Sequence, residues 1–279
     1  MCARPHLSRI PGGALLTAPL SYHCIQLHVF HLWRGAAHNC TGAQRVTSRE
    51  NGLHVIITQF MLTDDEATVP GAFEVYDEVA RTFTAEELPY VGFKNTGHPP
   101  SALRRLGRRI VGDGRKLVIE VAGGHESAER EAAGLAVELG AALLIGGVHT
   151  TTVREILRGT GIGYYPAVGD LTTEPGRLHG TVDGIVRQAR EVGALPDVNG
   201  VALHGYRYAG DPDALLHAIA QVDGLRVVNV GSVDSAQRIE ELRINEFWAF
   251  TIGGAVLDHT LPAGRTLAQQ LRWVLAVTH

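Results

Sequence analysis

The sequence predicts an α/β protein whose main part, residues 53–279, is a parallel, eight-stranded (β/α)8 TIM barrel. Three observations support this prediction. Apolar runs of β-type residues alternate with helical patterns eight times in about 225 residues. The apolar runs are nearly continuous, as in strands that are buried on both faces. Finally, turns of small residues follow the last two predicted strands, where barrels of this kind commonly hold a phosphate group.

The first four units share one rhythm of apolar run, loop and helical pattern. Pro99 and Pro100 precede the second helix, as expected because proline fits the start of a helix. The predicted strands are Val55–Leu62, Tyr90–Lys94, Leu117–Val121 and Leu143–Gly146. The predicted helices are Gly71–Phe83, Ser101–Val111, Ser127–Leu139 and Thr151–Arg158.

The second half of the barrel repeats this pattern. Asp211 is the expected N-cap of one helix, with Pro212 at its first position, where a missing N–H costs nothing. The predicted strands are Gly163–Ala167, Gly200–His204, Arg226–Val230 and Trp248–Ile252. The predicted helices are Thr181–Val192, Asp211–Val222, Ser235–Leu242 and Thr266–Val277.

An open, doubly wound sheet is the competing fold. Such a sheet usually carries a glycine-rich turn for a dinucleotide after its first strand. Here the first strand ends in Thr63-Asp64-Asp65-Glu66, and no glycine follows until Gly71. An acidic turn would repel a pyrophosphate, so we expect neither a Rossmann domain nor a nucleotide cofactor.

Residues 1–52 are expected to form a separate leader. This leader is either disordered or wrongly assigned to the protein, whose native start would then lie near Val46 or Val55. This leader contains all three cysteines and five of the 14 histidines. Its apolar piece Gly13–Leu20 is too short for a typical secretory signal. Three residues with possible metal-binding spacing lack the second ligand pair of a zinc finger: Cys24, His28 and His31.

Composition narrows the classes of function. The net charge of −4 implies no broad basic surface for nucleic acid. No apolar run is long enough for a transmembrane helix, so no membrane partner is expected. The absence of cysteine from residues 53–279 fits a reducing cytoplasm. No set of histidine and aspartate at the strand ends resembles a divalent-metal site, so no essential metal is expected.

The turns after the seventh and eighth strands predict a phosphate site. Their sequences are Val230-Gly231-Ser232-Val233-Asp234 and Thr251-Ile252-Gly253-Gly254-Ala255. Glycine allows an oxyanion to approach the main chain, where N–H groups can bind it. Plain tight turns also favour Gly and Ser. Two such turns on consecutive strands nevertheless favour phosphate binding by Gly231, Ser232, Gly253 and Gly254.

Lys94 and Glu120 are the predicted catalytic residues. The chain has 23 arginines and only two lysines, Lys94 and Lys116, so a lysine at a strand's carboxyl end suggests an amine that loses a proton. Glu120 lies in an apolar run, where a carboxylate is costly unless it is paired or used. A static salt bridge is the alternative for the pair.

Other strand ends supply weaker candidates. Asp64 is expected either to bind sugar hydroxyls or to cap the first helix, as is Asp65. His204 and Arg207 are expected to orient the substrate, with Arg207 suited to an anion. Three further polar residues follow strands without an assigned role: Asn95, His149 and Tyr206.

The last two turns resemble those of the ribulose-phosphate-binding barrel superfamily, which includes isomerases of histidine biosynthesis and N-acylmannosamine-6-phosphate 2-epimerases. Those epimerases use a Lys/Glu pair, which Lys94 and Glu120 resemble. The chain is also similar to a bacterial barrel family in which some members are labelled 4-hydroxythreonine-4-phosphate dehydrogenase. The similar stretches are Phe60-Met61-Leu62-Thr63, Gly92-Phe93-Lys94, Gly231-Ser232-Val233-Asp234-Ser235 and Phe250-Thr251-Ile252-Gly253.

Taken together, the sequence predicts an enzyme that acts on a small phosphorylated sugar or keto compound. The leading hypothesis is an isomerase or epimerase that uses Lys94 and Glu120 for proton transfer. A Schiff-base lyase or aldolase acting through Lys94 is the second hypothesis, and a non-catalytic binding protein is the third. The sequence leaves a monomer and a homodimer open.

Overall fold

The computed structural model describes residues 49–50, 53–171 and 176–278 of the 279-residue chain. The predicted leader lies outside the described residues except for Arg49–Glu50. These two residues form β1, which pairs antiparallel with β2 (Leu53–His54) before the barrel begins. The sequence features of the leader, including its cysteines and its apolar piece, also lie outside the described part.

Eight parallel strands confirm the predicted barrel. Along the sheet the order is β10-β11-β12-β3-β4-β5-β6-β7. A parallel bridge between Ala167 and Ala202 joins the two ends of this sheet and closes the ring. The strands are β3 (Ile57–Met61), β4 (Tyr90–Lys94), β5 (Lys116–Glu120), β6 (Leu143–Ile145), β7 (Gly163–Tyr165), β10 (Val201–Leu203), β11 (Val227–Asn229) and β12 (Ala249–Ile252).

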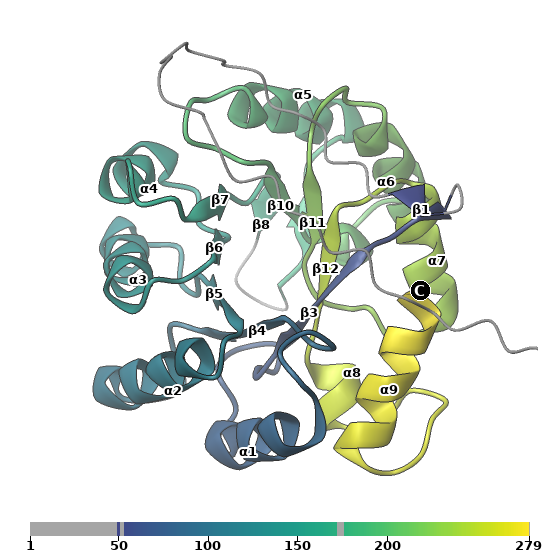
Figure 1. Ribbon diagram of the computed structural model, residues 1–279. Helices are drawn as coiled ribbons and strands as arrows, with labels where there is room; N and C mark the ends of the chain where they lie inside the picture. The colour runs from purple at the N-terminus through teal and green to yellow at the C-terminus, as the bar shows by residue number, and fades with distance from the viewer. Residues whose placement is uncertain (1–48, 51–52, 172–175, 279) are drawn as a thin grey trace, which may run out of the picture. The chain divides into compact units, whose positions relative to one another are not determined.

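Helices lie outside the ring of strands, as Figure 1 shows. Side-chain caps begin three of them: Thr181, Asp211 and Ser235 each accept a hydrogen bond from a backbone N–H of the first turn. The eight predicted helices are present as α1 (Ala72–Thr82), α2 (Pro100–Gly112), α3 (Glu126–Leu139), α4 (Thr150–Leu157), α5 (Val182–Gly193), α6 (Pro212–Ala220), α7 (Ala236–Ile244) and α9 (Leu267–Thr278).

Two apolar layers follow from the alternation of side chains along the strands. One layer packs between strands and helices, for example at Phe60, Phe93 and Phe250. The other fills the barrel interior with side chains such as Met61 and Val118. Since the interior is filled below them, polar side chains at the carboxyl ends of the strands border a cavity at the mouth of the barrel.

Besides β1 and β2, four described elements were not predicted, all in segments that connect strands to helices. They are β8 (Asp170–Leu171), β9 (Leu178–His179), the 3-10 helix η1 (Gly205–Arg207) and α8 (Gly254–Leu257). Elements of two to four residues are too short to show a hydrophobic period. No helix in the described part of the chain combines the length and the apolar character needed to cross a bilayer.

Candidate active site

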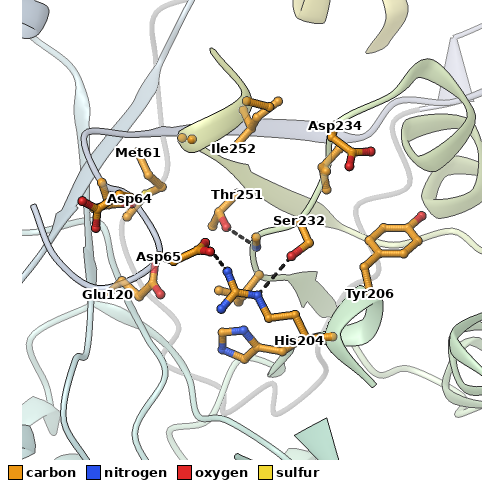
Figure 2. Close-up of a pocket in the computed structure, with 18 of the residues that line it drawn as sticks. Met61, Asp64, Asp65, Glu120, His204, Tyr206, Ser232, Asp234, Thr251 and Ile252 are labelled. Atoms are coloured by element: carbon orange, nitrogen blue, oxygen red, sulfur yellow. Dashed lines mark hydrogen bonds and ion pairs between the residues drawn. The ribbon is translucent and has the colours of Figure 1, made fainter. Parts of the chain in front are cut away.

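The carboxyl ends of the barrel strands surround a cavity of about 600 Å³. The loops or ends of β3, β4, β5, β10, β11 and β12 all contribute to its wall. Figure 2 shows Asp65, Glu120, His204, Ser232 and Thr251, from five of these elements, around one space. All ten residues to which the sequence assigned a role line this cavity: Asp64, Asp65, Lys94, Glu120, His204, Arg207, Gly231, Ser232, Gly253 and Gly254.

Lys94 and Glu120 are direct neighbours across the β4–β5 pairing. The Lys94 Nζ atom lies 3.8 Å from Glu120 Oε1. It also donates hydrogen bonds to the carbonyl oxygens of Asp64 at 3.1 Å and of Asp65 at 2.7 Å. Three acceptors therefore surround Nζ, an arrangement that suits an ammonium group with its three hydrogens.

Glu120 stands in an environment that disfavours a negative charge, with only 10% of its side chain exposed. Burial raises the pKa of the Glu120 carboxyl above its ordinary value, and the nearby charges of Lys94 and Arg207 oppose this effect without cancelling it. A carboxyl group with a raised pKa is suited to taking up and returning a proton closer to neutral pH.

The turn after β11 presents its backbone to the cavity. Gly231 and Ser232 both adopt left-handed conformations, with φ of 68° and 55°. This is ordinary for glycine but uncommon for serine. The Gly231 N–H donates to Thr251 Oγ1 at 2.8 Å, which fixes the turn against β12. The Ser232 N–H has no acceptor among the described residues.

The turn after β12 lies beside the first loop of the barrel. A Cβ atom on Gly253 would lie 2.4 Å from the carbonyl oxygen of Thr63, so only glycine allows this close approach. Helix α8 begins at Gly254, and the N–H groups of Gly254 and Ala255 find no acceptor within the described ranges. The two small-residue turns thus face one cavity with free N–H donors, as a phosphate site requires.

Arg207 connects these turns with the loop after β3. Its Nε–H donates to Ser232 Oγ at 3.0 Å, and its Nη2 forms an ion pair with the Asp65 carboxylate. Figure 2 marks both contacts. A second arginine that lines the cavity, Arg238, donates to the Ser232 carbonyl oxygen at 2.6 Å and to Asp234 at 2.8 Å, and so supports the same turn.

His204 faces Lys94 across the mouth, because β10 and β4 are four strands apart in a ring of eight. Burial lowers the pKa of His204 to about 3, and the positive charges of Arg207 and Lys94 add to this effect. The imidazole is therefore neutral near pH 7. Its Nδ1 atom is buried and has no hydrogen-bond partner in the described part of the protein.

Asp64 lines the cavity but does not cap the first helix, so that alternative is wrong. Helix α1 follows Gly71 and has no side-chain cap. Instead, the Asp64 carboxylate accepts hydrogen bonds from the N–H groups of Glu66 at 2.9 Å and Ala67 at 2.8 Å. It thereby shapes the loop whose carbonyl oxygens hold Lys94.

The remaining polar strand-end residues have structural partners. Asn95 accepts a hydrogen bond from the N–H of Ala122 at 2.6 Å. His149 Nδ1 lies 2.9 Å from the buried carboxylate of Glu129. Tyr206 lines the cavity and donates through its hydroxyl to the Arg238 carbonyl oxygen at 2.7 Å.

Sequence reasoning missed Thr251 and Arg238 as parts of the site. Thr251 lies in an apolar strand, where threonine is an ordinary β-former. Arg238 lies on α7 and not at the carboxyl end of a strand. Among the described residues, no group of three or more His, Cys, Asp or Glu side chains is arranged to hold a metal ion.

No protein-family model and no curated protein matches the chain. Solved structures share its fold at low identity. Orotidine 5'-phosphate decarboxylase from Pyrococcus horikoshii OT3 is 13% identical with a TM-score of 0.57, covering 80% of this chain and 99% of its own. N-(5'-phosphoribosyl)anthranilate isomerase from Pyrococcus furiosus is 11% identical with a TM-score of 0.53, covering 80% and 98%. The YdjI aldolase from Escherichia coli K12 is 13% identical with a TM-score of 0.53, covering 79% and 87%.

These similarities show the barrel fold. They include proteins named as an isomerase, a decarboxylase and an aldolase, so the fold by itself selects no reaction. The label 4-hydroxythreonine-4-phosphate dehydrogenase gains no support from the comparisons.

Proposed function

We propose that this protein is an isomerase or epimerase of a small phosphorylated sugar or keto compound. The observation that carries the proposal is the adjacent Lys94–Glu120 pair, which shares one cavity with two turns that present free backbone N–H groups. Each feature alone has a structural explanation. Their convergence at the carboxyl ends of the strands, where barrel enzymes place their chemistry, favours a catalytic site.

The phosphate group is bound by the turns after β11 and β12. The N–H groups of Ser232, Gly254 and Ala255 donate to its oxygens, and Arg207 contributes a positive charge. Because these donors sit on the backbone of short turns, they need no rearrangement to meet an anion. The phosphate thereby directs the rest of the substrate toward Lys94 and Glu120.

Proton transfer then occurs at a carbon next to a carbonyl group. The Glu120 carboxylate removes the proton, and the electron pair left on carbon moves onto the carbonyl oxygen to form an enolate. The Lys94 ammonium donates a hydrogen bond to that oxygen and stabilises its developing charge. For isomerisation, protonated Glu120 returns the proton to the former carbonyl carbon, while the hydroxyl proton on the first carbon passes to the enolate oxygen, so that a new carbonyl group forms and the carboxylate is restored. For epimerisation, the planar enolate turns over in the cavity before Glu120 returns the proton, which then adds to the opposite face of the same carbon.

A Schiff-base lyase is the second candidate, because Lys94 Nζ has a carboxyl group at 3.8 Å that can transfer protons during imine formation. Borohydride treatment in the presence of substrate separates the candidates. Only the lyase leaves a reduced adduct on Lys94. A non-catalytic binding protein would instead show altered affinity in Lys94→Met and Glu120→Gln, with no turnover in any form.

A thermal-shift panel tests the proposal. Phosphorylated metabolites are compared with their dephosphorylated counterparts, and a ligand at about 100 times its Kd adds about 2.7 kcal/mol of stability. Stabilisation by phosphorylated compounds alone is the expected result. If no phosphorylated compound stabilises a protein that melts cooperatively, the two turns are structural and the proposal loses its basis.

A further inference from the structure

We infer that Asp65 couples anion binding at Arg207 to the position of Lys94, because this one residue holds both cations. Its carboxylate forms an ion pair with Arg207 Nη2, and its carbonyl oxygen accepts a hydrogen bond from Lys94 Nζ at 2.7 Å. The inference rests on the proposed phosphate site and makes Asp65 a positioning residue for the catalytic lysine.

The ion pair has one fixed and one movable partner. The Arg207 side chain is 19% exposed, whereas the Asp65 side chain is 84% exposed. Arg207 is also held through Nε by Ser232 Oγ at 3.0 Å. An exposed carboxylate gains little from such a pair and can leave it readily. A phosphate held by the turns would compete with the Asp65 carboxylate for the same guanidinium donors, so Asp65 swings out while Arg207 stays.

The loop then loses one of its two attachments to the cavity wall at Asp65. The neighbouring Asp64 remains fixed, because its carboxylate accepts hydrogen bonds from Glu66 and Ala67 within the same turn. Loss of the ion pair frees the Asp65 backbone to shift, and its carbonyl oxygen then moves away from Lys94. The ammonium group, with one acceptor fewer, turns toward Glu120 and the substrate carbonyl.

The consequence is that the phosphate group of a substrate improves the position of the catalytic lysine as well as the binding affinity. In a compound without the phosphate, Asp65 keeps its pair with Arg207 and its carbonyl keeps Lys94 engaged. The substrate's own phosphate thus prepares the lysine that acts on its carbonyl group. Binding energy from a part of the substrate that does not react is used to position the reacting group.

The lysine content of the chain permits a direct test. Because Lys94 and Lys116 are the only lysines, labelling lysine with 13C at the ε carbon gives two side-chain NMR signals, which Lys116→Arg assigns. Lys116 is an internal reference, since it lies at the opposite end of the barrel beside Tyr90. Inorganic phosphate is the titrant, and calorimetry measures its Kd independently.

In the wild type we expect phosphate to shift the Lys94 signal and leave the Lys116 signal unchanged. In Asp65→Asn the Lys94 signal already lies near its phosphate-bound position, and the Kd for phosphate falls about 5-fold or more. Glu66→Gln is the matched control, because Glu66 is an exposed carboxylate that lines the same cavity. It removes the same charge and is expected to change the Kd by less than about 2-fold.

Two results would overturn the inference. If phosphate binds but leaves the Lys94 signal unmoved, or if Asp65→Asn binds phosphate no more tightly than Glu66→Gln, then Asp65 does not couple the two cations. If wild type and both variants bind no phosphate by calorimetry, the proposed phosphate site itself fails, and the coupling fails with it.

Discussion

At the scale of the single residue, Glu120 combines its proposed role in proton transfer with a cost in stability. Its raised pKa means that the folded protein binds this proton more tightly than the unfolded chain does. The contribution of Glu120 to stability is thus fully present below its unfolded pKa and is lost as pH rises through its folded pKa. Above its folded pKa the ionised carboxylate weakens the fold.

Glu120→Gln should therefore be more stable than the wild type at pH 7, by an amount on the order of 1 kcal/mol. The difference should shrink as the pH falls toward 4, because the wild-type carboxyl becomes protonated. Urea unfolding between pH 4 and pH 8 measures this difference. A variant that is less stable at pH 7 would show that the ion pair with Lys94 outweighs burial. A difference that does not change with pH would show that the two effects cancel.

The contribution of His204 to stability depends on pH in the opposite direction. The pKa of His204 is lowered from 6.5 to about 3, so the unfolded chain takes up a proton that the folded protein does not. Stability from this residue is present above pH 6.5 and is lost as pH falls from 6.5 toward 3. His204→Asn should reduce the pH dependence of stability in this range by up to about 1.4 kcal/mol per pH unit. Unfolding curves of the wild type and the variant at pH 7, 6 and 5 measure this pH dependence. An equal loss of stability in both proteins as the pH falls would contradict the prediction.

At the scale of the element, the apolar run of each strand can be predicted from the sequence, whereas the contacts of the side chains at its end cannot. The continuous apolar character of β4 and β5 predicts both strands. Because consecutive strands of a barrel are neighbours, the sequence also predicts that Lys94 and Glu120 lie near each other. Which acceptors surround the Lys94 ammonium group depends on the conformation of the loop after β3. The pairing of Asp65 with Arg207 joins residues 142 positions apart, and no local pattern reports it.

The close packing of β4 gives a prediction at this scale. A Cβ on Gly92 would lie 2.4 Å from the Val118 carbonyl oxygen and 2.7 Å from Met61 Sδ. Gly92→Ala should therefore destabilise the barrel by roughly 1–3 kcal/mol through overpacking. Gly134→Ala, on the exposed face of α3 with no atom within 4 Å of the new Cβ, is the control and should stabilise by roughly 0.5–1 kcal/mol. Equal effects of the two changes in urea unfolding would contradict this packing.

At the scale of the whole molecule, the barrel is predicted to fold without the N-terminal residues. The apolar core of the described part draws on residues from Ile56 onward. Residues Arg45–His279 form one compact unit. Removal of residues 1–44 should therefore leave a cooperative unfolding transition whose free energy changes by less than about 0.5 kcal/mol. Circular dichroism during urea unfolding measures this free energy. A broadened transition would mean that the barrel needs the removed residues.

The general fold follows from the sequence because eight repeats of one pattern leave few alternatives, whereas the reaction depends on the geometry of a few side chains. Proton exchange at carbon tests that geometry most directly. Phosphorylated sugars and keto compounds that stabilise the protein are incubated with it in D2O and followed by 1H NMR. We predict that a C–H signal next to the carbonyl group disappears with the wild type and persists at least about 100-fold longer with Glu120→Gln. If every C–H signal survives with the wild type, or if Glu120→Gln exchanges as fast, proton transfer by Glu120 is not the function of this cavity.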